Sequence, residues 1–461
     1  MLSRVLVYIL ALRRKDTAYE EFMILINDRY RRVLSISLPS AFHNLMNMVQ
    51  SMIDMLFVGR ISAVSLASVG VSMQYTALLY AFMSLVYVGT NVLVSRFYGS
   101  KEMDKAGQTV YVMILFSFII SLPLMVFCLF YSPVLFEILG TGEDVVREGT
   151  VYISTYSYAL PAMFIQGVLF SGLNALGKTK IPLYISISGN ILNFFLDWAM
   201  IFGHFGFPAM GIKGAALATV IVIYYQLAIY FICYFFSKDI KIIPSFDMSI
   251  LKRGIKVAVP AWLERIVAHP SYLVLSALVA KFGVDALAGY QVGLRIEGLA
   301  FMPGVGFIFA SMALVGQGLG AGNPDEAEKD AYAATISASV IMGVLGLLMT
   351  AFPYAIAGIF TDNQATLDNA AWYLRIMGVS QVPLAVCFVI SGSLRGAGDT
   401  NMTFAINAVS LWGFRILPAW LLTYYVTNSV WVYLVAMIES VVRAAILLVR
   451  FRTGKWKSIK V

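Results

Sequence analysis

Charged side chains are scarce in this chain of 461 residues. Asp, Glu, Lys and Arg together account for 13% of the sequence, and hydrophobic residues account for 60%. Soluble globular proteins contain roughly one-quarter charged residues and about half apolar ones. The composition therefore excludes a soluble globular protein and predicts an integral membrane protein.

Cysteine and histidine are also rare, with three residues of each. Cys128, Cys233 and Cys387 lie in apolar runs without C-x-x-C spacing, which is typical of small buried side chains and argues against a disulfide framework. The sequence has no H-E-x-x-H, no Walker A motif and no G-x-G-x-x-G after a strand. We therefore expect no cofactor and no ATP-driven chemistry. An intramembrane enzyme would need a histidine cluster or a Ser-Lys dyad, and neither pattern is found.

What the chain has in abundance is apolar runs. At roughly 20 residues per membrane-crossing helix, the runs predict twelve spans, near residues 33–58, 66–95, 107–132, 148–175, 180–202, 211–236, 253–281, 286–319, 329–354, 369–394, 401–425 and 428–450. The predicted fold class is an all-α integral membrane protein with twelve transmembrane helices.

The net charge of +8 gathers in the segments between these spans. The side with both termini receives most Lys and Arg, and the opposite side receives only Arg60, Arg147, Lys213 and Lys281. Because basic residues collect on the cytoplasmic side of a membrane, both termini should be cytoplasmic, and no nucleic-acid partner is indicated. Residues 1–32 are interpreted as a cytoplasmic, partly amphipathic leader, with the alternative that translation starts near Met23.

The two halves of the sequence match on one diagonal, shifted by 221 positions. The matched pairs include Pro39 with Pro260, Gly99 with Gly320 and Thr179 with Thr400. Six crossings per half is an even number, so the halves should be two six-helix lobes related by a pseudo-two-fold axis along the membrane normal. The predicted organisation is an N-lobe at 33–236, a cytoplasmic linker at 237–252, a C-lobe at 253–450 and a basic cytoplasmic tail at 451–461.

Few acids lie inside the spans of the N-lobe. Asn190, Asn193 and Asp197 are spaced i, i+3 and i+7, so they share one helix face. At 1.5 Å per residue, Asp197, Asp54 and Thr219 all lie roughly 9 Å below the outer surface. Two acids, an amide, a hydroxyl and a main-chain carbonyl would suit Na⁺ or a proton shared by carboxylates. The alternative, a structural pair between each acid and an Arg, is weakened because the apolar N-lobe spans contain no Arg, and no Lys beyond Lys180 and Lys213 at the starts of their spans.

The C-lobe lacks this acid pair. The residues that match Asp54, Asn193 and Asp197 are Leu275, Phe414 and Pro418. Mixed charges are present instead, and we interpret them as internal salt bridges rather than substrate contacts. They are Glu264, Arg265, His269, Arg295, Glu297, Arg375, Arg415, Glu439 and Arg443.

A substrate cavity and a gate have candidate residues as well. Abundant Phe, Tyr and Met can line a cavity for bulky cations. Pro39 and Pro260, near the inner ends of their helices, remove backbone hydrogen bonds and predict bends that can act as gates. The polar residues expected in the cavity are Asn47, Gln50, Gln166 and Asn190.

Nearly all of residues 33–450 resemble the multidrug and toxic compound extrusion (MATE) family. The segments that carry the resemblance are "MIDMLFVGR" (52–60), "NFFLDWAMIFGHFGFPAMGIKGAALAT" (193–219), "ALAGYQVGLRIEGLAFMPGVGFIFASMALVGQGLGAGNPDEA" (286–327) and "SGSLRGAGDT" (391–400). The resemblance implies a two-lobed antiporter in the cytoplasmic membrane of a prokaryote. Such an antiporter expels small lipophilic, often cationic compounds by alternating access, driven by H⁺ or Na⁺.

The resemblance also implies a coupling-cation site. Its residues would be Asp54, Asn193, Asp197, Thr219 and the main-chain carbonyl of Ala215. Ala268 stands where a better-known bacterial subgroup has a functional Glu, so we place the chain nearer the DinF-like subgroup, which couples through the N-lobe. We expect a monomer. A flippase for lipid-linked saccharides, from the wider superfamily, stays as the alternative, although it would want a cationic cavity.

Overall fold

The computed structural model describes residues 16–461, with side chains from Asp28 onward. Residues 1–15 of the expected leader lie outside the described residues. The described chain forms helices and no strand. Its elements are α2 (Asp16–Gly59), α3 (Ala63–Gly99), α4 (Met103–Ile138), α5 (Glu143–Ser157), α6 (Leu160–Ala175), α7 (Lys180–Phe202), α8 (Ile212–Phe235), α9 (Met248–Ala280), α10 (Val284–Gly320), α11 (Pro324–Ala351), α12 (Pro353–Ala357), α13 (Gln364–Gly396), α14 (Thr400–Val409), the π-helix η2 (Ser410–Ile416), α15 (Leu417–Leu422), α16 (Val430–Arg452) and the 3-10 helix η3 (Lys455–Ser458).

The helices correspond to the twelve predicted spans, of which the span 148–175 is broken into α5 and α6. Ten helical stretches in the described residues are long and apolar enough to cross a membrane. The remaining spans are α2, which includes part of the leader, and the pair α5 and α6, which is interrupted just before Pro161. In lipid, backbone groups must bond to one another, so apolar runs of this length cross as helices. The break before Pro161 follows from its ring, which favours the first turn of a helix.

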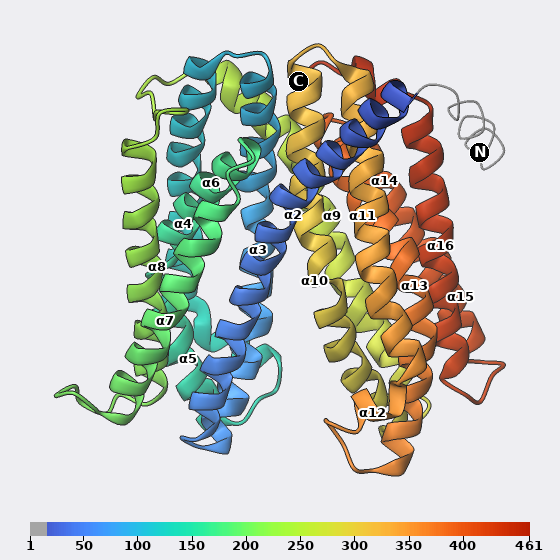
Figure 1. The fold of residues 1–461 in the computed structure, drawn as a ribbon. Coiled ribbons are helices and arrows are strands. Elements are labelled where there is room, and N and C mark those ends of the chain that lie inside the picture. Colours follow the sequence, from blue (N-terminus) through green and yellow to red (C-terminus); the bar gives the residue numbers. More distant parts are fainter. Residues whose placement is uncertain (1–15) are drawn as a thin grey trace.

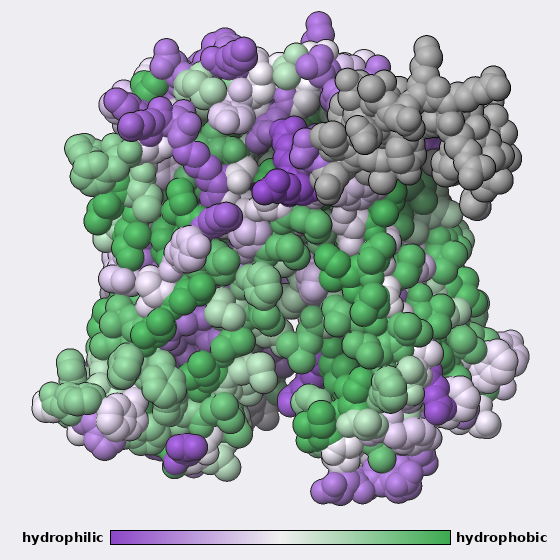
Figure 2. Space-filling view, in the orientation of Figure 1, coloured by the Kyte–Doolittle hydropathy of each residue, from purple (hydrophilic) through white to green (hydrophobic). Residues whose placement is uncertain are grey.

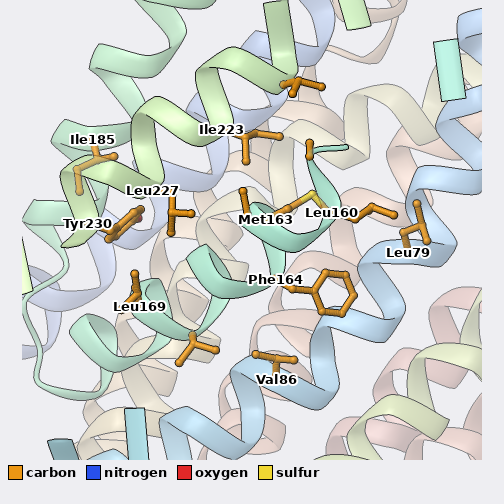
Figure 3. Packing of buried hydrophobic residues seen from close by; sticks show 14 of the residues in the cluster. Leu79, Val86, Leu160, Met163, Phe164, Leu169, Ile185, Ile223, Leu227 and Tyr230 are labelled. Atoms are coloured by element: carbon orange, nitrogen blue, oxygen red, sulfur yellow. The ribbon is translucent and has the colours of Figure 1, made fainter. Parts of the chain in front are cut away.

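Figure 1 shows two helix bundles side by side, which meet at the end carrying the C-terminus and separate toward the opposite end. Spans 1 to 6 form the N-lobe and spans 7 to 12 form the C-lobe. Each lobe has its own apolar core. In the N-lobe, Leu79 and Val86 of α3 face Phe164 of α6, and Ile223 of α8 lies close by (Figure 3).

The pseudo-two-fold symmetry is visible where α3 crosses α10. A Cβ atom added to Gly99 would lie 2.1 Å from the carbonyl oxygen of Gln317, and one added to Gly320 would lie 2.1 Å from the carbonyl oxygen of Arg96. Both contacts join residues that exchange under the shift of 221 positions. The side chains follow nearly the same pattern, with acceptors one position apart in register: Arg96 donates to the carbonyl of Ala397 at 2.8 Å and Gln317 donates to that of Ala175 at 2.7 Å.

The first helix of each lobe crosses to the other lobe at this closed end. Val33 and Ile36 of α2 share an apolar cluster with Phe307 of α10 and with residues of α11 and α13. Val257 of α9 shares a cluster with Val88 of α3 in the same way. The expected N-lobe boundary at residue 33 therefore falls inside a continuous helix whose beginning packs on the C-lobe (Figure 1).

The tail expected at 451–461 continues from α16 and is folded against the closed end. Trp456 is fully buried and stacks on Phe451. The carbonyl of Ile459 accepts a hydrogen bond from Arg96 of the N-lobe at 3.1 Å. Lys457 forms ion pairs with Asp325 and Glu328 of α11, at 2.7 and 2.6 Å. The tail thus touches both lobes.

The surface agrees with a membrane setting. Figure 2 shows hydrophobic side chains around the waist of both bundles and hydrophilic ones at the end with the C-terminus. Large apolar side chains such as Ile119, Phe130 and Phe235 are exposed on the outside. Their burial then comes from lipid rather than from protein. The same view shows an opening between the bundles at the end opposite to the C-terminus.

Candidate functional site

Two acids of the N-lobe meet inside the membrane region. Asp54 lies on α2, a little more than one turn before this helix ends at Gly59, and Asp197 lies on α7. The helices α2 and α7 pack against each other, and the two carboxyl groups lie close together without a hydrogen bond between them. Asp197 is fully buried, and Asn193, one turn earlier on α7, is only 1% exposed. The structure thus joins residues that the sequence placed at one depth.

These polar atoms have few partners in the protein. Both oxygens of Asp197, Oδ1 of Asp54 and both amide atoms of Asn193 lie buried without a hydrogen bond. Asp54 and Asp197 form no ion pair with any Lys, Arg or His of the described chain. A buried ionised carboxylate without a counter-charge or donor costs several kcal/mol. The donor set is therefore one that a small cation or a proton satisfies.

Thr219 completes one side of this site. It lies on α8, which packs against α7, and its side chain lines the same cavity as Asp54. Its Oγ1 donates to the main-chain carbonyl of Ala215 at 3.1 Å. The hydroxyl and the carbonyl expected at the cation site are thus adjacent. Carboxylate, hydroxyl and carbonyl oxygens are hard donors, and they come from Asp54, Asp197, Thr219 and Ala215. Among the described residues no group of three or more His, Cys, Asp or Glu side chains is placed to hold a metal ion.

A cavity of ≈ 510 Å³ opens beside the acid pair, lined mainly by the N-lobe and on one side by Met302, Val305 and Phe309 of α10. Asn47, Gln50 and Gln166 line it, as the sequence predicted, together with five methionines and several aromatic rings. Asn190 does not line this cavity: its Nδ2 donates to the main-chain carbonyl of Met46 at 2.7 Å, so that it ties α7 to α2.

Three tyrosines that line this cavity were not predicted from the sequence. Tyr80 of α3 and Tyr152 and Tyr156 of α5 line it near the acids. The rings of Tyr152 and Tyr156 stack with centroids 6.2 Å apart. Their spacing of four residues on one helix was the available signal, but an amphipathic helix carries such pairs for many reasons. Aromatic faces next to carboxylates are suited to lipophilic cations.

His43 fixes α2 against α7. Its Nδ1 lies 3.2 Å from the carbonyl of Pro182 and donates to it, while Nε2 accepts from Asn47 at 3.4 Å. Asn47 in turn accepts from Ser186 at 3.2 Å. The ring also stacks on Phe170 at 4.6 Å. His43 therefore serves as a contact between helices.

The charged residues of the C-lobe surround a second cavity of ≈ 550 Å³. Glu264 pairs with Arg395 at 2.5 Å and accepts from Asn407 at 2.9 Å. Glu439 is buried between two arginines, at 2.6 Å from Arg415 and 3.1 Å from Arg443. These are internal salt bridges, as the mixed charges predicted.

Some of the charged residues predicted for the C-lobe lie outside these salt bridges or have other partners. Glu297 accepts a hydrogen bond from Tyr373. Arg295 is exposed, does not line this cavity and takes part in no ion pair of the described chain, so its place in the cluster was predicted wrongly. The helical period explains the difference, because Leu294 and Glu297, three residues apart on α10, line the cavity, and Arg295 lies on another face of the helix. Arg375 lies over the rings of Tyr354 and Trp372, at 5.3 and 5.4 Å.

The two candidate gating prolines lie inside long helices. Pro39 is in α2 and Pro260 is in α9, each in the part of its helix that crosses to the other lobe. Ala41, two residues after Pro39, touches the backbone position of Gly306 on α10. A change of bend at either proline would therefore move the contact between the lobes.

A family model named MatE matches the chain twice, at residues 39–199 and 260–421. The two matches begin 221 positions apart, which is the shift found in the sequence. The chain belongs to the MATE family. Its membrane-spanning helices and two lobes are those of a transporter of this family.

Known relatives and solved structures agree with this assignment. The chain is 26% identical to a probable multidrug resistance protein NorM of Thermotoga maritima over 439 residues, which cover 93% of each chain. It is also 26% identical to a probable multidrug resistance protein YoeA of Bacillus subtilis, over 86% of this chain and 87% of that one. Its fold is similar to the Vibrio cholerae MATE transporter VcmN in the bent form, with a TM-score of 0.87, 20% identity and coverage of 93% and 97%. A transporter from Pyrococcus furiosus has a TM-score of 0.86, with 20% identity and coverage of 94% and 97%.

The family repeat also relates the two cavities. Asp54 of the N-lobe cavity corresponds to Leu275 of the C-lobe cavity, and Tyr152 corresponds to Tyr373. Each residue of these pairs lines its own cavity. The MATE fold therefore places two cavities at matched positions, and Val305 lines both of them.

Proposed function

We propose that this MATE protein is a secondary exporter that expels lipophilic, mainly cationic small molecules in exchange for H⁺ or Na⁺. The coupling cation binds in the N-lobe, at Asp54, Asn193, Asp197 and Thr219, with the carbonyl of Ala215. The observation that carries the proposal is the burial of two neighbouring carboxyl groups, on the packed helices α2 and α7, without a basic partner among the described residues. The multidrug names of the bacterial relatives support the substrate class.

The neighbouring cavity supports the choice of substrate. Methionine side chains are flexible and polarizable, and aromatic faces attract cations, so one cavity accepts ligands of several shapes. Its lining contains no Lys or Arg, which a pyrophosphate-bearing lipid would need, so the flippase alternative is disfavoured for this cavity. One chain contains both cavities and the acid pair, so a monomer is sufficient for the exchange that we propose.

The direction of transport follows from the two lobes. With cytoplasmic termini in a prokaryotic inner membrane, the closed end faces the cytoplasm and the opening in Figure 2 faces outward. A cation that enters from outside reaches Asp54 and Asp197 and replaces the positive drug as their counter-charge. Drug and coupling cation then oppose each other's binding, and this negative coupling is what antiport requires.

Dye efflux from everted membrane vesicles tests the proposal. Asp54→Asn and Asp197→Asn should each abolish efflux driven by an imposed pH or Na⁺ gradient, because the amide keeps the shape of the side chain and cannot take up the cation's charge. Thr219→Ala and Asn193→Ala should weaken coupling less, since each removes one neutral ligand.

The control is Asp144→Asn, which changes an exposed acid paired with Arg147 one turn away on α5. Its efflux should equal that of the unchanged protein. The gradient that drives efflux identifies the ion. Full gradient-driven efflux by Asp197→Asn at normal expression would place the coupling site elsewhere.

A further inference from the structure

The cavity of the C-lobe has the same position in its repeat as the N-lobe cavity but the opposite charge. Its lining includes Arg265, Glu297 and Arg443 at the positions that Asn44, Thr76 and Val222 occupy in the N-lobe cavity. The repeat thus placed cationic residues in a cavity whose counterpart contains an acid and no Lys or Arg. The C-lobe cavity is therefore suited to ligands of a different charge from those that suit the N-lobe cavity.

The balance of charges around the C-lobe cavity leaves one cation in excess. The carboxylates of Glu264, Glu297 and Glu439 face the four guanidinium groups of Arg265, Arg395, Arg415 and Arg443. A single excess positive charge matches an anion with one charge. A pyrophosphate, with several charges, would be under-compensated.

Arg265 is the arginine without a carboxylate partner among the described residues. Arg395 is bound to Glu264, and Arg415 and Arg443 share Glu439. The guanidinium of Arg265 instead donates to the hydroxyl of Tyr87, a neutral group on α3, at 3.1 Å. Its side chain is exposed in the cavity rather than buried in the wall. Its remaining donors are therefore available to a ligand, and a guanidinium prefers a carboxylate in bidentate geometry.

The rest of the wall is apolar. Leu294, Phe301, Met377 and Phe388 line the same cavity as Arg265, together with Tyr272. A ligand that fills ≈ 550 Å³ here must cover these side chains as well as meet the arginine. The chemistry is that of an amphipathic molecule with one acidic group and a large apolar body.

We propose that the C-lobe cavity is a binding site for amphipathic monocarboxylates, whose carboxylate contacts Arg265 and whose apolar body lies against Phe301 and Phe388. This adds a ligand class to the proposed export of lipophilic cations and does not depend on the acid pair of the N-lobe. A zwitterionic compound can use both cavities, because they adjoin at Val305.

The test uses dansyl-labelled undecanoic acid and its neutral methyl ester, which share an apolar body and differ in one charge. Binding to the purified full chain in lipid nanodiscs at neutral pH is followed by dansyl fluorescence, with protein-free nanodiscs as the background. The acid should bind more tightly than the ester. Arg265→Gln should weaken binding of the acid about tenfold, which corresponds to about 1.4 kcal/mol for one lost charge-assisted contact, and should leave the ester unchanged. Arg265→Lys should restore part of the difference.

The matched control is Arg452→Gln, which removes an exposed arginine at the closed end of α16 and should change neither affinity. Asp197→Asn separates this inference from the proposed coupling, because it should abolish efflux and leave binding of the acid unchanged. Equal binding of acid and ester by the unchanged protein would overturn the inference. Equal weakening of both probes by Arg265→Gln would overturn it too, since the arginine would then only shape the cavity.

Discussion

Replacing Gly99 by alanine should shift the protein toward the form that is open at the end now closed. An alanine Cβ at residue 99 would lie 2.1 Å from the carbonyl oxygen of Gln317. The obstacle is backbone of α10, so no side-chain rotation relieves it. To bring this contact from 2.1 Å to an ordinary 3.4 Å, α3 and α10 must separate by about 1.3 Å.

The expected size of the effect follows from the cost of overpacking. Forcing a methyl group into a tight contact costs about 1–3 kcal/mol, and the whole cost falls on the conformation in which α3 and α10 touch. The ratio of the two conformations should therefore change by roughly 5- to 150-fold. Gly320→Ala should have the same effect, because its Cβ would meet the carbonyl of Arg96 at the same 2.1 Å.

Electron–electron double resonance measures this shift directly. Spin labels at residues 60 and 362 sit on exposed turns of the N-lobe and the C-lobe, at the end that is now open. Cys128, Cys233 and Cys387 are first replaced by alanine. In Gly99→Ala, the population at the longer distance should fall and a shorter distance should appear, because closure at this end accompanies opening at the other.

Gly70→Ala is the matched control, since Gly70 lies on the same helix and a Cβ there meets nothing within 4 Å. It should keep the distances of the unchanged protein. If Gly99→Ala gives the same distance distribution as Gly70→Ala, the glycine contact does not decide between the two conformations, and the reasoning is refuted.

Two further changes probe the gate and the charged cluster. Pro39→Ala restores a backbone donor toward the carbonyl of Ser35 and should slow dye efflux more than it weakens dye binding; equal losses of rate and affinity would speak against a gating role. Glu439→Gln leaves Arg415 and Arg443 buried without their counter-charge and should destabilise the protein by about 3–5 kcal/mol, seen as a lower midpoint of heat unfolding in detergent. An unchanged midpoint would mean that water or lipid compensates the two arginines.

The sequence alone predicted the features that depend on local composition and on repetition. Apolar runs of membrane length become helices because the bilayer leaves no other partner for the backbone. The shift of 221 positions predicted two related lobes, and the contacts of Gly99 and Gly320 follow the same shift. The common depth of Asp54 and Asp197 was predictable as well, because the position along a membrane helix fixes the height of a residue; which helices are neighbours was not.

Other features depended on how the helices pack. Helix periodicity does not say which neighbour a face meets, so the tyrosines around the acid pair and the outward position of Arg295 were found only in the folded chain. The composition of the basic tail did not predict that Ile459 and Lys457 contact the two lobes. Arg415 has a carboxylate partner and Arg265 has none among the described residues. This difference also depends on distances between helices that are far apart in the chain. Tertiary structure decided these points because an interaction between charges depends on their separation in space, and sequence spacing fixes that separation only within one helix.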